Sequence, residues 1–192
     1  MQGDTFNPTG HLEVWKVYRD GTKELHWTDH NVITSGMGIG LAQLYSASGS
    51  DSILDYQILN FQVGTSGDTE NYGVSSYKLE GPLSGVRPYG IQTGLQVETF
   101  QPIQNGVVAD EESFVRIPYS NIHKVSKTAV RYTLVLEERS GNATDELNEI
   151  GLFMRNPSGL TPASPILVAY RPFEGIKKTE YFTLVFLWTL QF

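Results

Sequence analysis

YFTLVFLWTLQF, residues 181–192, closes the sequence, and apart from Thr183, Thr189 and Gln191 it is apolar or aromatic. Strict alternation of apolar and polar residues would indicate a strand with one solvent-exposed face. A nearly continuous run rich in β-branched and aromatic residues is instead typical of a strand covered on both faces. The run is too short for a membrane-spanning helix, which needs about 20 apolar residues. We therefore expect a buried strand that is tied into a sheet or covered by another subunit.

Strand patterns separated by turn signals extend over most of the remaining chain. Asp20-Gly21, a dipeptide typical of tight hairpin turns, separates two strand-like segments at 12–19 and 23–27. We expect further strands at 58–63, 95–100, 113–119, 125–138, 147–155 and 166–170. The last of these is expected to pair with the closing strand across the connection at 171–180.

One helix is expected between Asn31 and Ser46, with Thr34 or Ser35 as its N-cap. Its apolar side chains recur at helical offsets, and they are Ile33, Met37, Leu41, Leu44 and Tyr45. Glycines at positions 36, 38 and 40 favour a helix that lies close to a sheet. The alternative, a phosphate-binding loop, lacks the required glycine spacing and the Lys-Ser/Thr pair.

Together these patterns predict a mainly β fold: an antiparallel β-sandwich of about seven to nine strands, with one α-helix packed against it and long loops. We divide the chain into an N-terminal arm and β-hairpin at 1–30 and a β-sandwich domain at 31–192. The second part carries a long inserted loop at about 65–94. Irregular segments of this length are usually functional or ordered by a partner.

Composition argues against several classes of protein. The net charge is −7 over 192 residues, whereas a nucleic-acid-binding protein would present a basic face. Cysteine is absent, which removes disulfides and thiolate metal sites. Charged residues make up only 18% while turn-forming residues are plentiful, which fits a β-rich assembly subunit better than a lone enzyme. We expect no nucleic-acid partner and no membrane partner.

The sequence shows no constellation typical of catalysis or metal binding. His26 and His30 would lie about 13 Å apart on an extended strand, too far to share a metal ion. The segment at 64–68 is one residue short of the glycine-serine motif of hydrolases. The acidic runs at 110–112 and 145–146 are typical of solvated loops, with loop calcium as the alternative. We expect no enzymatic activity, no catalytic residue, no cofactor and no bound metal.

Aromatic and basic side chains supply candidates for contact with partners. Scattered aromatics in a β-rich protein are usually core or interface residues, and paired lysines beside acidic loops can set the register of an interface. The interface candidates are Tyr72, Tyr77, Tyr89, Lys177, Lys178 and Trp188. The three tyrosines are also the candidates for a glycan-binding surface.

Glu149 stands out because it precedes the apolar run Ile150-Gly151-Leu152-Phe153. A carboxylate at such a position must be paired if it is buried. We interpret Glu149 as a structural polar tie whose expected partner is Arg131, Arg155 or Arg171.

Five short motifs follow one another in a particular order. They are Asn31-Val32-Ile33-Thr34 before the helix, Phe61-Gln62-Val63-Gly64-Thr65, Asn148-Glu149-Ile150-Gly151-Leu152-Phe153, Leu167-Val168-Ala169-Tyr170-Arg171-Pro172-Phe173 with Lys177-Lys178-Thr179, and Val185-Phe186-Leu187-Trp188-Thr189-Leu190-Gln191-Phe192. This series resembles small virion proteins of tailed bacteriophages, namely tail-fibre, baseplate and neck or collar components. The resemblance spans roughly residues 31–192.

The resemblance implies a non-enzymatic structural subunit of the phage particle. Such a subunit is made in the cytoplasm of the host bacterium, assembles as a homo-oligomer with cyclic symmetry in the tail, neck or baseplate, and docks neighbouring virion proteins or fibres. The family supplies no catalytic residues to carry over. The alternative is a carbohydrate- or receptor-binding module at a fibre tip, and a hydrolase acting through the acidic loops is a more distant one.

Overall fold

The computed structural model describes residues 7–46, 56–83, 114–142, 145–154 and 165–192. These residues form nine strands and one α-helix, α1, at Ser35–Ser46. The strands are β1 (Thr9–Tyr18), β2 (Lys23–Ile33), β3 (Ile58–Gly64), β4 (Val115–Arg116), β5 (Ile122–Lys124), β6 (Ala129–Leu136), β7 (Leu147–Met154), β8 (Ile166–Ile176) and β9 (Phe182–Gln191). A short 3-10 helix, η3, covers Tyr119–Asn121. The strand expected at 95–100 and the acidic run at 110–112 lie outside the described residues.

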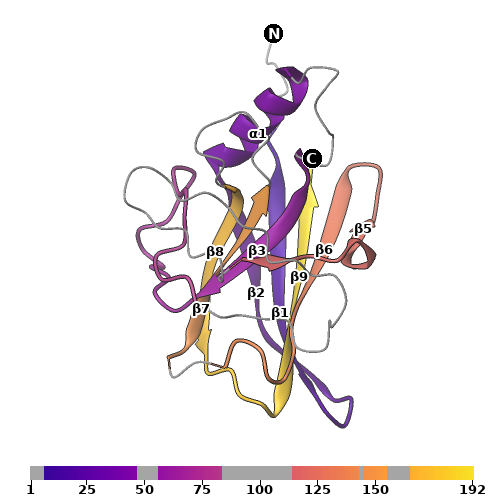
Figure 1. Ribbon diagram of the computed structural model, residues 1–192, viewed down its shortest axis with the longest axis vertical. Helices are drawn as coiled ribbons and strands as arrows, with labels where there is room; N and C mark the ends of the chain where they lie inside the picture. Colours follow the sequence, from indigo (N-terminus) through magenta and orange to yellow (C-terminus); the bar gives the residue numbers. More distant parts are fainter. Residues whose placement is uncertain (1–6, 47–55, 84–113, 143–144, 155–164) are drawn as a thin grey trace.

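The nine strands form one antiparallel sheet in the order β4-β3-β7-β8-β2-β1-β9-β6-β5, and this sheet curls into a half-barrel (Figure 1). A mainly β, antiparallel fold with one helix is confirmed, but the expected two-sheet sandwich is wrong. The reason lies in β2, which pairs with β1 up to Asn31 and then with β8 at Val32 and Ile33. One long strand thus carries the hydrogen bonding from one half of the sheet to the other.

The closing strand β9 lies between β1 and β6. Its buried and half-buried residues alternate, so that Phe186 and Trp188 point into the core while Val185 and Leu187 on the other face stay partly exposed. The expectation that both faces would be covered is therefore wrong. A half-barrel has its core on the concave side, and the outer face of β9 carries no second layer among the described residues.

The expected pairing of β8 with β9 is also wrong, because β2 and β1 lie between them in the sheet. The connection after Ile176 runs across the end of the half-barrel opposite α1 (Figure 1), and β8 and β9 face each other across the core. Phe173 of β8 and Phe186 of β9 show this, since their ring centroids lie 5.9 Å apart. The two halves of the sheet thereby share one hydrophobic core.

Helix α1 lies across one end of the half-barrel, at the top of Figure 1. A Cβ atom on Gly36 would lie 2.0 Å from the carbonyl oxygen of Leu167, and one on Gly40 would lie 2.3 Å from the sulfur of Met154. The interpretation that small residues bring the helix close to the sheet is thus confirmed for these two glycines. Tyr45, expected on the buried stripe, is instead 85% exposed.

The β1–β2 hairpin lies in the middle of the strand order, between β8 and β9. Leu12 and Val14 of β1 are fully buried in the same core as the strands that follow. The hairpin and the rest of the described chain therefore form one packed unit around this core. Of the inserted loop expected at 65–94, residues 65–83 are described.

Gly10 occupies a crowded position in β1, paired with Asn31 of β2 and with Leu190 of β9. The Trp188 indole N–H donates a hydrogen bond of 2.8 Å to Asn31 Oδ1. The amide of Asn31 lies over Gly10, because a Cβ atom on that glycine would lie 1.7 Å from Asn31 Oδ1. Only a residue without a side chain leaves room for this hydrogen bond.

We predict that Gly10→Ala lowers the free energy of unfolding by about 1–3 kcal/mol, because overpacking displaces the Asn31 amide. Urea denaturation measures the effect. Gly38→Ala is the matched control: apart from the helix's own backbone, a Cβ atom on Gly38 would meet nothing within 4 Å, and a helical alanine should raise stability by about 1 kcal/mol or less. In an Asn31→Gly background the cost of Gly10→Ala should shrink, and an unchanged cost would contradict the explanation.

Candidate functional site

Glu149 of β7 is fully buried and accepts three hydrogen bonds. Its Oε1 accepts from the backbone N–H of Gly81 at 2.7 Å. Its Oε2 accepts from the backbone N–H of Glu80 at 3.0 Å and from the Tyr170 hydroxyl at 2.7 Å. Gly64, paired opposite Glu149, leaves room for the carboxylate, since a Cβ there would lie 2.3 Å from Oε1. The carboxylate therefore fastens the loop around residue 80 to the sheet.

The expected arginine partner of Glu149 is not found among the described arginines. Arg131 donates its Nε to the Thr189 hydroxyl at 3.2 Å, and Arg171 pairs with Asp29 at 2.6 Å. Arg155 lies outside the described residues. The described partners of the buried carboxylate are backbone N–H groups and a phenol instead, and such hydrogen bonds stabilise a buried carboxylate.

Arg171 of β8 forms the centre of a second cluster, which also involves the loop at 65–83. Its guanidinium lies 5.1 Å from the ring centroid of Trp27 and 5.1 Å from that of Tyr72. It donates hydrogen bonds to Asp29 at 2.6 Å and to the Tyr72 hydroxyl. These contacts join β2, β8 and the loop at 65–83, so Tyr72 belongs to an internal contact and is half-buried.

Tyr77 is 63% exposed, and the Lys78 ammonium lies 6.0 Å from its ring centroid. Tyr72 and Tyr77 line one shallow depression of about 390 Å³ on this loop. Its other lining residues are polar or small, and they include Asn71, Ser75, Ser76, Lys78 and Glu80. Tyr89 lies outside the described residues.

Two of the remaining interface candidates are buried within this chain. Trp188 is 0% exposed because the alternation of β9 directs it into the core, and Lys178 is 1% exposed. Both assignments as contact residues are therefore corrected to structural roles. Lys177, their neighbour in the expected set, is exposed.

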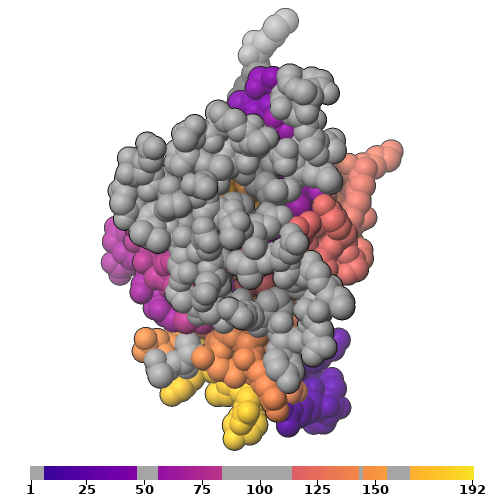
Figure 2. Space-filling model, viewed as in Figure 1, coloured from indigo at the N-terminus to yellow at the C-terminus, as the bar shows by residue number. Residues whose placement is uncertain are grey.

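Lys178 joins turns at the end of the half-barrel opposite α1. Its ammonium donates to the Glu138 carbonyl at 3.1 Å, to Asn142 Oδ1 at 3.2 Å and to the Thr179 carbonyl at 2.8 Å. Arg19, from the β1–β2 turn, forms a two-pronged pair with the Glu138 carboxylate at 2.8–2.9 Å. Figure 2 shows the three segments, in indigo, orange and yellow, gathered at its lower end.

We predict that the free energy of unfolding rises as the pH increases from about 8 to about 10.5. Burial lowers the pKa of Lys178 from 10.5 to about 8, with partial opposition from the Glu138 carboxylate. The folded protein therefore releases this proton at a lower pH than the unfolded chain, which favours folding as the pH rises. The expected gain is on the order of 1–3 kcal/mol.

Lys178→Met should remove this pH dependence, and urea denaturation of both proteins at several pH values measures it. Comparison of the two proteins is needed because Tyr132 and Tyr170 lower the free energy of unfolding as the pH rises above about 10. Burial raises the pKa of both phenols, so the folded state resists their ionisation in either protein. An identical pH profile for Lys178→Met and the natural protein would contradict the prediction.

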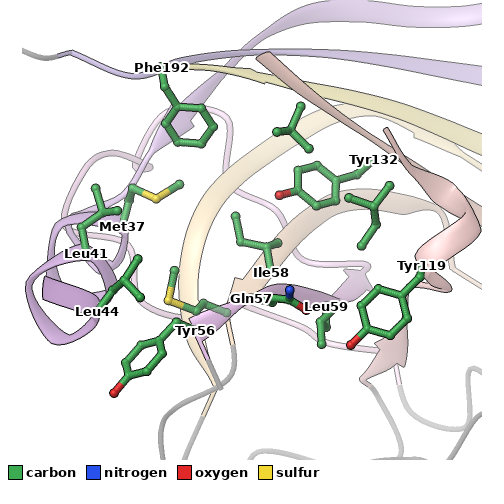
Figure 3. Close-up of a pocket in the computed structure, with 13 residues that line it drawn as sticks. Met37, Leu41, Leu44, Tyr56, Gln57, Ile58, Leu59, Tyr119, Tyr132 and Phe192 are labelled. Carbon is green, nitrogen blue, oxygen red and sulfur yellow. The ribbon is translucent and has the colours of Figure 1, made fainter. Parts of the chain in front are cut away.

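An apolar pocket of about 320 Å³ lies between the two edges of the curled sheet (Figure 3). We call it the seam pocket. It is lined by side chains from α1, β3, β5, β6, β7 and η3, among them Met37, Ile58, Tyr119, Tyr132 and Met154, and by Phe192. No sequence pattern predicted it, because its walls come from segments far apart in the chain.

The described residues contain no group of three or more histidines, aspartates and glutamates arranged to hold a metal ion. The Nε2–H of His26 donates one hydrogen bond of 3.1 Å to the Glu174 carbonyl, and His30 packs edge-on against His11. Among the described residues, no helix has the length and apolar character needed to span a bilayer.

No family model, curated protein or solved structure matches this chain. The assignment of a function therefore depends on the motifs of the sequence and on the surfaces described above.

Proposed function

We propose that this chain is a non-enzymatic structural subunit of a tailed phage particle. It assembles as a homo-oligomer with cyclic symmetry in the tail, neck or baseplate region and docks neighbouring virion proteins or fibres. The observation that carries the proposal is the ordered series of motifs that resembles small phage virion proteins. The three-dimensional roles of those motifs support it.

The motifs meet in pairs at the joints of the half-barrel. Asn31 of the first motif accepts the indole hydrogen bond of Trp188 from the last. Gly64 of the second motif lies opposite Glu149 of the third, and Glu149 accepts from Tyr170 of the fourth. The motifs that carry the resemblance to virion proteins thus make contacts that stabilise the fold. A structural subunit needs such contacts.

The described surface also carries large apolar side chains that a partner would cover. Single residues of this kind are normal on a protein surface, and a partner that covers them adds to stability. Those at least 44% exposed are Leu25, Ile39, Tyr45, Val74, Tyr77, Tyr119, Val125 and Tyr181. A symmetric assembly would remove such surface from water.

Mass spectrometry of phage particles purified from the host bacterium tests the proposal. We expect peptides of this chain in a fixed ratio to a known tail protein, and we expect the purified chain to sediment as a ring-sized oligomer. A non-virion phage protein from the same lysate serves as the negative control. Absence from particles, together with a chain that stays monomeric, would overturn the proposal.

A second function, recognition of carbohydrate, is favoured by the depression on the loop at 65–83. Tyr72 and Tyr77 line it together with Asn71 and Glu80, which is the mixture of aromatic and polar groups that sugars require. A glycan array compares the natural protein with Tyr77→Ala, and Tyr181→Ala, at another exposed tyrosine, is the matched control. Binding lost only in Tyr77→Ala would favour this function.

A further inference from the structure

The size and the lining of the seam pocket fit an apolar side chain. Its walls are mainly apolar, and two of its residues are methionines, Met37 and Met154, whose flexible side chains adapt to the shape of a bound group. Its volume of about 320 Å³ falls at the lower end of the range for ligand pockets. The pocket therefore has room for one side chain of a partner.

Two polar atoms at the pocket lack partners within the described chain. Tyr132 is only 6% exposed, and its hydroxyl makes no hydrogen bond with any described residue. In Figure 3 this hydroxyl points toward the space between Phe192, Met37 and Ile58. The Gln57 side-chain oxygen, which also lines the pocket, is buried without a hydrogen-bond partner. The Tyr132 hydroxyl keeps some contact with solvent, whereas the Gln57 oxygen is buried. Buried polar groups are nearly always satisfied, so the Gln57 oxygen indicates a group that arrives from outside.

The β5–β6 hairpin beside the pocket is basic, although the whole chain carries a charge of −7. Residues 119–136 contain Lys124, Lys127 and Arg131 but no Asp or Glu. All three basic side chains are exposed, and no salt bridge to either lysine comes from the described residues. Ile122, Val130 and Tyr132 of the same segment line the pocket, so charge and cavity are adjacent.

We propose that the seam pocket receives a tyrosine or tryptophan side chain from an acidic segment of a neighbouring particle protein. The aromatic ring packs between the methionines and Phe192, while its O–H or N–H supplies the donor that Gln57 lacks. The acidic flanks lie against Lys124 and Lys127. This inference rests on the proposed function, and it names the chemistry of the partner.

A free aromatic metabolite fits the observations less well than a polypeptide does. The exposed apolar surface continues outside the cavity, because Tyr119 is 52% and Phe192 is 36% exposed at its rim. Val125 on the hairpin is 45% exposed. A small ligand would leave this rim and the lysines uncovered, whereas a peptide segment covers both.

Methyl NMR of the full chain labelled at methionine tests the proposal. The chain has only three methionines, Met1, Met37 and Met154, and the last two line the pocket. The probe is acetyl-Asp-Tyr-Asp-amide, and its controls replace the tyrosine with alanine or both aspartates with lysine. A single side chain binds with a dissociation constant of about 1–10 mM.

We expect saturable shifts of the Met37 and Met154 signals with the tyrosine peptide, none for Met1, and none with the alanine peptide. The lysine-flanked peptide should bind about tenfold more weakly. Lys124→Glu/Lys127→Glu should weaken binding of the natural probe similarly, whereas Lys23→Glu/Lys177→Glu, the same charge change at exposed lysines elsewhere, should not. Unmoved pocket signals, or equal shifts with the alanine peptide, would overturn the proposal.

Tyr132→Phe gives an independent reading because it removes only a hydroxyl and leaves the pocket shape intact. Binding of the tyrosine peptide should fall several-fold in this variant. Failure of this inference and failure of the proposed function are distinguishable. If the chain is found in particles but its pocket does not bind the probe, only the pocket assignment is contradicted. If the chain binds the probe but is absent from particles, only its assignment to the virion is contradicted.

Discussion

Replacement of Trp188 by alanine is expected to lower the free energy of unfolding by about 3–5 kcal/mol. Trp188 is the largest fully buried side chain of the described residues, and it lies on the concave face of β9, between β1 and β6. Its removal leaves a cavity between both halves of the half-barrel, and the surrounding strands can collapse only partially. It also deprives Asn31 of the indole hydrogen bond. Urea denaturation monitored by far-ultraviolet circular dichroism measures the change.

Trp188→Phe separates the two contributions, because it keeps most of the ring but removes the N–H donor. We expect a loss of about 1–3 kcal/mol, part of it from the unpaired Asn31 amide. Thr183→Ser, on the partly exposed face of the same strand, is the control and should change stability by less than about 1 kcal/mol. If Trp188→Ala and Thr183→Ser had similar effects, the central position of Trp188 in the core would be contradicted.

Glu149→Ala is expected to lower the free energy of unfolding by about 2–4 kcal/mol. The substitution leaves the backbone N–H groups of Glu80 and Gly81 and the Tyr170 hydroxyl without their shared acceptor. Leu79, only 2% exposed, packs on the sheet beside this contact, so release of the loop also uncovers apolar surface. Denaturation with urea gives the magnitude, and hydrogen exchange of residues 79–83 shows where protection is lost.

Two variants make the explanation for Glu149 falsifiable. Glu149→Gln keeps one acceptor oxygen and should cost roughly half as much as the alanine variant. Glu174→Ala changes the charge equally at an exposed position and should stay within about 0.5 kcal/mol of the natural protein. Undiminished exchange protection at 79–83 in Glu149→Ala would show that the carboxylate does not hold the loop.

The role of Glu149 illustrates how far the sequence alone leads. Its place before an apolar run predicted a carboxylate in need of a partner, and the residue is indeed fully buried with hydrogen bonds. The predicted arginine partner is not found in the described chain, because the donors are backbone N–H groups of a loop 68–69 residues away. Backbone donors leave no mark on a sequence pattern, so only the folded chain reveals them.

The seam pocket and the Arg171 cluster were not predicted for a related reason. The pocket needs Met37 of α1 beside Tyr132 of β6, and the cluster needs Trp27 of β2 beside Tyr72 of the loop. These residues are unremarkable in their local segments. Their proximity follows from the curl of the sheet, which brings its two edges together, and from the short pairing of β2 with β8.

By itself the sequence determined the mainly antiparallel β character, the Asp20-Gly21 turn with Gly21 at a φ of 84°, and the single helix lying close through Gly36 and Gly40. Each depends on side-chain periodicity or turn chemistry within about a dozen residues. Only the tertiary structure decided that β2 pairs with both β1 and β8 and so joins all the strands in one sheet. It also decided that β9 lies between β1 and β6, and which groups form hydrogen bonds with Glu149. Strand order and closure arise from contacts between distant segments, whose free energies compete over the whole chain.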